Sequence, residues 1–173
     1  MKTAILVMIG LATGLSAIFL AVPTAAAEKD IFGWAEEVLV GSSKLELEAK
    51  LDTGADTSSL HATGIRSYRR AGEFWVEFLV ADEDSGRRVR FRKPLVRVAR
   101  IKEHDGEPQQ RPVVEVEICL GDHLLEVETS LTDRSEFLYP VLLGRNALEG
   151  LAVVDPGLTQ TRAPECDEGG GTD

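Results

Sequence analysis

Apolar and polar side chains alternate with a period of two over much of this chain. The clearest case is residues 45–51, where four apolar residues are separated by Glu46, Glu48 and Lys50. This period is typical of a β-strand that buries one face. Comparable apolar runs predict further strands over residues 31–40, 74–81, 89–95, 113–120, 124–129, 141–143 and 151–154.

Short clusters of turn-forming residues separate these runs. Residues 82–86 close a hairpin with a polar tip, and Gly121-Asp122 joins the run 113–120 to its return strand. Beyond the first 27 residues, the helical signal is one short stretch at residues 146–149. The pattern predicts an all-β fold, a small closed barrel with one short C-terminal helix.

The first 27 residues differ from the rest of the chain. A basic start at Lys2, an apolar block at residues 4–22 and a small-residue exit at residues 25–27 predict a secretory signal peptide, residues 1–27. An uncleaved membrane anchor is the alternative, because the apolar block approaches the roughly 20 residues that span a bilayer. We therefore expect a periplasmic or secreted protein, membrane-anchored if the leader is retained and without membrane contact once it is cleaved.

The remaining chain divides into one domain and a polar end. At 173 residues in all, the chain suffices for one ordinary domain, predicted at residues 28–160. Residues 161–173 lack periodicity, end in a glycine-rich stretch and predict a disordered tail. Cys119 and Cys166 leave two alternatives: a disulfide formed after export, or a buried free thiol together with a loose one.

Charge is unevenly distributed along the chain. The formal net charge is −10, which disfavours nucleic acid as a partner. Residues 66–102 nevertheless contain eleven basic residues against five acidic ones. The sequence thus predicts one basic region in an acidic protein.

The triplet Asp52-Thr53-Gly54 directly follows the alternating strand 45–51. Glycine permits a tight turn, and the threonine hydroxyl can fix that turn by hydrogen bonding. The aspartate carboxylate then faces the space beyond the strand. The same triplet also forms ordinary surface turns, so the triplet alone does not decide between the two readings.

The surrounding residues extend this motif. The run from Ala49 to Leu60 resembles the active-site stretch of retropepsins, which are homodimeric aspartic proteases, and residues 140–146 resemble the family's hydrophobic-Gly-Arg-Asn element. Bacterial retropepsin-like proteins, historically labelled ATP-dependent zinc proteases, resemble the chain over about residues 33–156. The shared motifs are residues 51–62, 111–114, 131–135 and 143–145.

The resemblance implies roles for individual residues. Asp52 would be the catalytic carboxylate, with Thr53 bracing the turn across a dimer axis and Gly54 allowing close approach. Asp56 and Arg145 would form an ion pair, or else be two unrelated surface charges. Two further residues have implied roles, Gly144 as scaffold and Ala55 as part of the substrate site.

A second aspartate is required, because two facing carboxylates share one proton and act as base and acid. The sequence offers Asp84-Ser85-Gly86, but charged residues flank this triplet and no apolar strand leads to it. It is predicted to be a hairpin tip. The resemblance therefore implies a symmetric homodimer, with Asp52 supplied by each copy.

The hairpin of residues 74–93 takes the place of the retropepsin flap, although its tip is acidic where retroviral flaps are glycine-rich. It brings Arg87 and Arg88 toward the expected cleft, and we hypothesise that these residues bind an acidic peptide or acid-rich polymer. The alternative is that the arginines form the solvated face of the strands.

Metal and cofactor chemistry is not predicted. The chain has His61, His104 and His123, but neither a His-Glu-x-x-His motif nor a glycine-rich phosphate loop. Of the three histidines, His61 is the one that lies just past the expected catalytic turn at residues 52–54. We predict an exported aspartic endopeptidase that hydrolyses a peptide or protein substrate; the alternative is a catalytically silent module that binds a peptide or partner protein.

Overall fold

A computed structural model provides the structure of the chain and describes residues 28–101 and 108–166. The predicted signal peptide lies outside these residues. The elements are β1 (Asp30–Val40), β2 (Leu45–Leu51), β3 (Ser58–His61), β4 (Thr63–Arg70), β5 (Glu73–Ala81), β6 (Arg88–Pro94), β7 (Arg97–Ile101), β8 (Gln109–Leu120), β9 (His123–Thr132), β10 (Val141–Leu143), α1 (Arg145–Leu148) and β11 (Ala152–Thr159).

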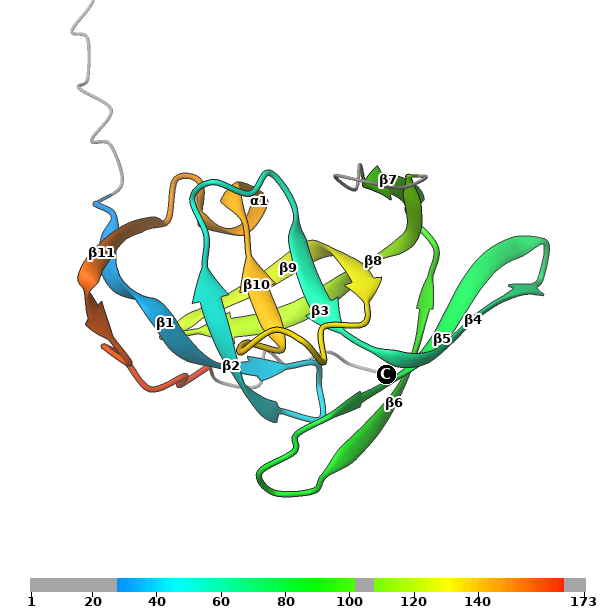
Figure 1. The fold of residues 1–173 in the computed structure, drawn as a ribbon, viewed down its shortest axis with the longest axis horizontal. Coiled ribbons are helices and arrows are strands. Elements are labelled where there is room, and N and C mark those ends of the chain that lie inside the picture. The colour runs from blue at the N-terminus through cyan, green and yellow to red at the C-terminus, as the bar shows by residue number, and fades with distance from the viewer. Residues whose placement is uncertain (1–27, 102–107, 167–173) are drawn as a thin grey trace, which may run out of the picture.

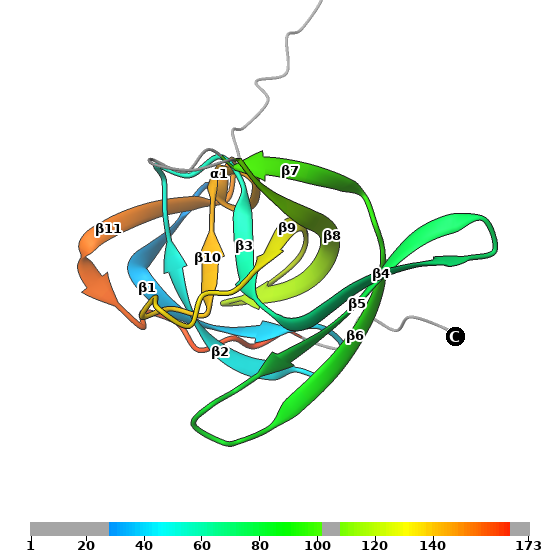
Figure 2. The ribbon, with the colours of Figure 1, turned by 45° about the vertical axis from the view of Figure 1, so that its right-hand side comes forward.

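The main sheet closes on itself. Its strand order is β11-β1-β2-β10-β3-β9-β8-β7, and a further pairing joins β1 to β8. The strands from β1 to β8 in this order therefore form a closed ring, with β11 and β7 attached outside it (Figures 1 and 2). The prediction of a small closed all-β barrel with one short helix is confirmed.

The strand β10 lies between two strands that are consecutive along the chain. It pairs in parallel with β2 and antiparallel with β3, so that Leu142 is opposite both Lys50 and Ser59. The segment that connects β2 to β3, residues 52–57, must therefore pass over the end of β10. Figure 1 shows this connection at one end of the barrel, beside α1.

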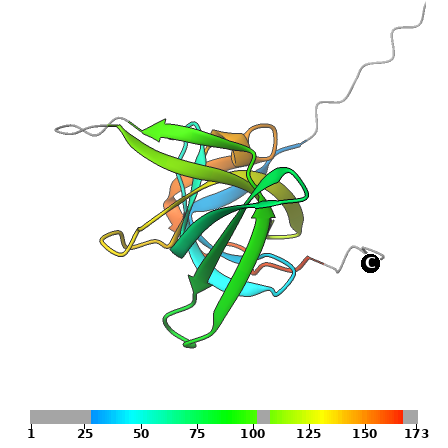
Figure 3. The same ribbon diagram turned by 90° about the vertical axis from the view of Figure 1, so that its right-hand side faces the viewer.

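A second, three-stranded sheet of order β4-β5-β6 lies against one side of the barrel (Figure 3). Its inward side chains Val76, Phe78, Val80 and Phe91 are buried, and the rings of Phe78 and Phe91 stack with centroids 5.3 Å apart. The far half of the β4–β5 hairpin projects away from the barrel into solvent.

The period of two predicts the barrel core correctly. In β2, buried residues alternate with the exposed or half-buried Glu46, Glu48 and Lys50. Each large aliphatic or aromatic side chain buried in this way contributes about 1.5–3 kcal/mol. The barrel is thus stabilised from within, and the outer face of β2 remains free for polar side chains.

Three strands are not predicted from the sequence. β4 and β7 are mostly exposed, so their side chains carry no alternating pattern. β3 contains Ser58 and Ser59, which are buried although polar. Pairing with neighbouring strands stabilises these segments, and the local sequence does not reveal such pairing.

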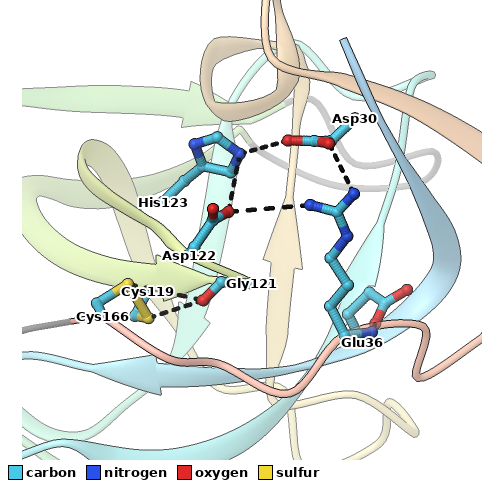
Figure 4. A network of polar contacts seen from close by, with 8 residues as sticks. Asp30, Glu36, Cys119, Gly121, Asp122, His123 and Cys166 are labelled. Atoms are coloured by element: carbon cyan, nitrogen blue, oxygen red, sulfur yellow. Dashed lines mark hydrogen bonds and ion pairs between the residues drawn. A yellow bond between two sulfur atoms is a disulfide. The ribbon is translucent and has the colours of Figure 1, made fainter.

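The C-terminal segment is held against the barrel, which corrects the predicted tail. Cys119 and Cys166 form a disulfide, so the disulfide alternative for these two cysteines is confirmed. Thr161 and Arg162 donate hydrogen bonds to the buried Glu36. Residues 161–166 are therefore ordered, whereas residues 167–173 lie outside the described part. Figure 4 shows the disulfide beside the polar network of this region.

Within the described residues, no helix has the length and apolar character required to cross a bilayer.

Candidate functional site

Asp52 is the first residue after β2, at the end of the barrel. Its backbone N–H donates to the carbonyl of Leu143 at 2.8 Å. The N–H of Gly54 donates to Asp52 Oδ1 at 2.9 Å, and the N–H of Ala55 donates to the Asp52 carbonyl at 3.2 Å. Asp52 is half-buried, with Thr53 and Gly54 exposed. The predicted triplet therefore forms one tight turn that presents a carboxylate at the barrel end.

The first residue of α1 supports this turn. The backbone N–H of Arg145 donates to the carbonyl of Ala55, and its guanidinium donates to the carbonyl of Thr53, both at 2.9 Å. The expected ion pair between Arg145 and Asp56 is present. The Asp56 side chain is 85% exposed. The pair therefore contributes to stability as a surface salt bridge does, by about 1 kcal/mol or less. The bond to the Thr53 carbonyl fixes the turn more directly.

Gly144 allows the turn and α1 to approach closely. A Cβ atom at this position would lie 2.9 Å from the Thr57 carbonyl carbon and 3.0 Å from the Ala55 oxygen. Both are backbone atoms that cannot rotate away. The N–H of Gly144 donates to Ser58 Oγ at 3.0 Å, and Ser58 in turn donates to Asn146 Oδ1 at 2.8 Å. The implied scaffold role of Gly144 therefore has a steric basis.

Lys50 bonds to the Asp52 carboxylate within a single chain. Its Nζ lies 3.2 Å from Asp52 Oδ2. Burial acts to raise the pKa of Asp52, but the hydrogen bonds from Lys50 and from the Gly54 N–H outweigh it and leave the pKa below its usual value. Asp52 of one chain is thus ionised at neutral pH, whereas a second carboxylate facing it would raise the pKa of the pair.

Three side chains on neighbouring strands, Lys50, Leu142 and Ser59, form a row next to Asp52. Because alternate residues of a strand face the same side, Lys50 shares the open face of Asp52. Strand register places Leu142 beside Lys50 and Ser59 beside Leu142. Ser59 accepts a hydrogen bond from Arg134 at 2.8 Å. The row Lys50–Leu142–Ser59 is called the floor beside Asp52 below. It has a cation at each end, which are Lys50 itself and the Arg134 that bonds to Ser59.

Arg134 is buried, with 7% of its surface exposed. Its Nε donates to the Tyr139 carbonyl at 3.0 Å, and its guanidinium lies 4.7 Å from the centre of the Phe137 ring. Burial lowers the pKa of Arg134, the charge of Arg111 adds to this effect, and the charge of Asp52 opposes it. Asp52 and Arg134 are thus close enough to interact electrostatically.

A cavity of about 550 Å³ adjoins Arg134. One wall is formed by the β5–β6 turn, and another by residues that follow Arg134. Six carboxylates line it, together with Arg134 and His61. The acidic residues are Glu37, Glu46, Glu48, Asp82, Glu83 and Asp84.

The position of the β5–β6 hairpin bears on whether it acts as a flap, which the sequence leaves open. Its turn lies at the end of the barrel opposite to residues 52–57 (Figures 1 and 2). Arg87 donates to the carbonyls of Ser43 and Lys44 and so attaches this turn to the β1–β2 connection. Arg87 is therefore not brought to Asp52. Asp84-Ser85-Gly86 lies in this turn, as predicted.

The basic region is partly neutralised. Arg66, Arg90 and Arg92 all bind the carboxylate of Glu77, whose pKa their hydrogen bonds lower to about 2. Arg88 is exposed at the start of β6. Three of the arginines thus hold the three-stranded sheet together, and the sheet does not place Arg88 beside Asp52.

Among the described residues, one group has the spacing of metal ligands: Asp30, Asp122 and His123. Arg162 forms ion pairs with both carboxylates, so a cation already occupies the space between them. His61 lies elsewhere, and its Nδ1 accepts the backbone N–H of Arg134 at 2.8 Å. This bond leaves Nδ1 unavailable as a metal ligand.

Comparison with known proteins identifies the family. The RimB-like profile, described as retropepsin-like aspartic endopeptidase RimB, matches residues 31–165. The chain belongs to the RimB-like family. A solved Legionella pneumophila protein of unknown function (DUF785) is 37% identical, with a TM-score of 0.68 over 78% of this chain and 98% of that protein.

Curated relatives of this RimB-like chain carry another name. Proteins named "Probable alpha-L-glutamate ligase" are 39% identical over 112 residues in Shewanella halifaxensis and 34% identical over 114 residues in Desulfotalea psychrophila. The matched region covers 64% and 65% of this chain. It spans only about a quarter of those relatives, 24% and 25% of their length.

Two residues of the candidate site beside Asp52 were missed as site residues in the sequence. Lys50 carried a usable signal, because alternation in β2 places it on the same face as Asp52. Arg134 is 82 positions beyond Asp52 and carried no spacing signal, although it lies in the family motif at residues 131–135. Its position depends on the β9–β10 connection folding back onto Ser59.

Proposed function

We propose that the chain is an aspartic endopeptidase whose catalytic dyad consists of Asp52 from two copies. The observation that carries this proposal is the Asp52 turn itself, which presents a partly exposed carboxylate on a support built from Gly144 and Arg145. In a dyad, one carboxylate takes a proton from water while the other protonates the peptide carbonyl.

A second copy supplies the second carboxylate in this proposal. The alternative triplet, Asp84-Ser85-Gly86, is in the β5–β6 turn, which Figure 1 shows at the other end of the barrel. Thr53 is exposed next to Asp52, where a partner can reach its hydroxyl. A symmetric dimer that pairs the two 52–57 segments would place the carboxylates face to face.

We further propose an acidic peptide as the substrate. The relatives named as α-L-glutamate ligases support α-linked glutamate as the relevant chemistry. Lys50 and Arg134 on the floor beside Asp52 support it independently. Export is also proposed, and the Cys119–Cys166 disulfide supports it because such bonds persist in oxidising compartments.

The test is cleavage of a glutamate-containing peptide library by the wild type and Asp52→Asn at pH 4–7. We expect activity to fall at least about 1000-fold in the variant, because an asparagine amide cannot take the proton from water or donate it to the peptide carbonyl as a carboxyl group does. Asp84→Asn is the control for the second triplet and should still cleave, with any change confined to peptide preference because Asp84 lines the cavity beside Arg134. Equal activity of the wild type and Asp52→Asn would reject the mechanism.

A peptide-binding module is the second candidate. It is favoured by the relatives, in which the matched region is about a quarter of a protein named for ligation. In that case the wild type and Asp52→Asn would bind acidic peptides equally, and neither would cleave them.

A further inference from the structure

Arg134 is a buried cation without a buried anion to balance it. Its hydrogen-bond partners are neutral: the hydroxyl of Ser59 and the carbonyl of Tyr139. No ion pair among the described residues includes Arg134. A charged group removed from water normally has a partner of opposite charge, because burial without one is costly.

The surroundings of Arg134 hold it in place without neutralising it. Its backbone N–H donates to His61 Nδ1, its Nε and one terminal nitrogen have fixed partners, and its guanidinium lies over the Phe137 ring. An arginine fixed in this way is pre-organised, so that binding an anion costs little side-chain entropy. Planar guanidinium and carboxylate groups also match in geometry.

The position of Arg134 relates this cation to Asp52. Arg134 binds Ser59, which lies in the row Lys50–Leu142–Ser59 one step from Asp52 on the open face. Lys50 already bonds to Asp52, which leaves Arg134 as the cation available to a ligand on this floor. Arg134 also lines the cavity, whose lining does not include Asp52 or Lys50 and which has room for one side chain beside Arg134.

We propose that Arg134 binds the carboxylate of one acidic side chain of the substrate, at a single position close to the bond that Asp52 cleaves. This inference rests on the proposed function and assigns its acid preference to one residue. The role is positional, because Arg134 is fixed at one place, and the six carboxylates on the other walls of the cavity disfavour an acidic side chain that does not reach Arg134. A general attraction by the basic β4–β6 sheet would show no such dependence on position.

The experiment measures binding, so that it does not depend on catalysis. Short peptides that carry a single glutamate, placed at successive positions in an otherwise uncharged sequence, are titrated into Asp52→Asn by calorimetry, and matched peptides carry glutamine instead. At one position we expect glutamate to bind about 10- to 100-fold more tightly than glutamine, the range of a charge-assisted hydrogen bond of about 1.5–3 kcal/mol. The same difference should appear in cleavage by the wild type.

Substitutions at Arg134 then decide the assignment. In the Asp52→Asn background, Arg134→Met should bind both peptides about equally, and Arg134→Lys should restore part of the preference. Arg69→Gln is the matched control, since it removes one positive charge from the exposed β4–β5 hairpin. It should leave the ratio unchanged.

Several results would overturn the proposal. These are a glutamate preference that survives Arg134→Met, a preference spread evenly over all positions, or none at any position. A variant that merely unfolds would weaken glutamate and glutamine peptides alike, and the partial rescue by lysine would be missing. Failure of the proposed function is separate, because it appears as cleavage that does not depend on Asp52 or as no cleavage at all, while the binding ratio still reports on Arg134.

Discussion

Two charged networks on the same barrel differ in whether they are complete. At the C-terminal segment, Asp30 accepts from His123 and Arg162, both at 2.7 Å, and the buried Glu36 accepts from Thr161. Each buried or half-buried charge there has a partner, as Figure 4 shows for Asp30, Asp122 and His123. A disulfide between Cys119 and Cys166 fastens the same region.

The network at the Asp52 turn is not complete within one chain. Asp52 has Lys50, but it remains partly exposed at the end of the barrel. Arg134 is buried and binds only neutral oxygens within the described residues. Charges that have a partner within the chain stabilise the fold, whereas charges without one are suited to bind a ligand or a second copy.

Removal of the disulfide should have the largest effect on stability. The double variant Cys119→Ala/Cys166→Ala should lose about 2–4 kcal/mol, since the bond links residues 47 positions apart and restricts the unfolded chain. Peptide cleavage at a temperature where the variant is folded should be retained. Chemical denaturation measures the first quantity, and reduced wild type is its control. Loss of cleavage in the folded variant would contradict a purely structural role.

Gly144→Ala should have the next largest effect and should act on both stability and cleavage. Its Cβ would contact the backbone of Ala55 and Thr57, so we expect a loss of about 1–3 kcal/mol and a displaced Asp52 turn. Gly157→Ala is the control, because its Cβ would meet only a side-chain oxygen of Asp155 at 3.2 Å. Equal kcat values for the two variants would show that Gly144 does not position the turn.

Asp30→Asn should have the smallest effect, and it should depend on pH. Hydrogen bonds from His123 and then Arg162 lower the pKa of Asp30 below its usual 3.8. The carboxylate therefore stabilises the fold above the usual pKa, and this contribution disappears as the pH falls through the lowered value. The variant should be less stable than the wild type at neutral pH, and the gap should narrow on acidification. A gap that does not depend on pH would contradict this account.

The sequence predicted the parts of the fold that follow from local pattern. Alternation identified β2, and the motif around Asp52 identified both the turn and its contact with Arg145. It did not identify β4, whose exposed side chains show no period, or the position of the β5–β6 turn, which tertiary contacts such as that of Arg87 determine. Arg134 lies at the site because the β9–β10 connection folds back onto Ser59, and no local sequence pattern predicts this contact.

The central claim is that Asp52 is half of a site completed by a second copy. Its most direct test mixes wild type with isotopically labelled Asp52→Asn, confirms subunit exchange by native mass spectrometry, and measures peptide cleavage at each ratio. If a dyad spans the dimer, activity should fall as the square of the wild-type fraction, because mixed dimers carry one carboxylate. A linear decrease would show that each chain acts alone and would contradict the account.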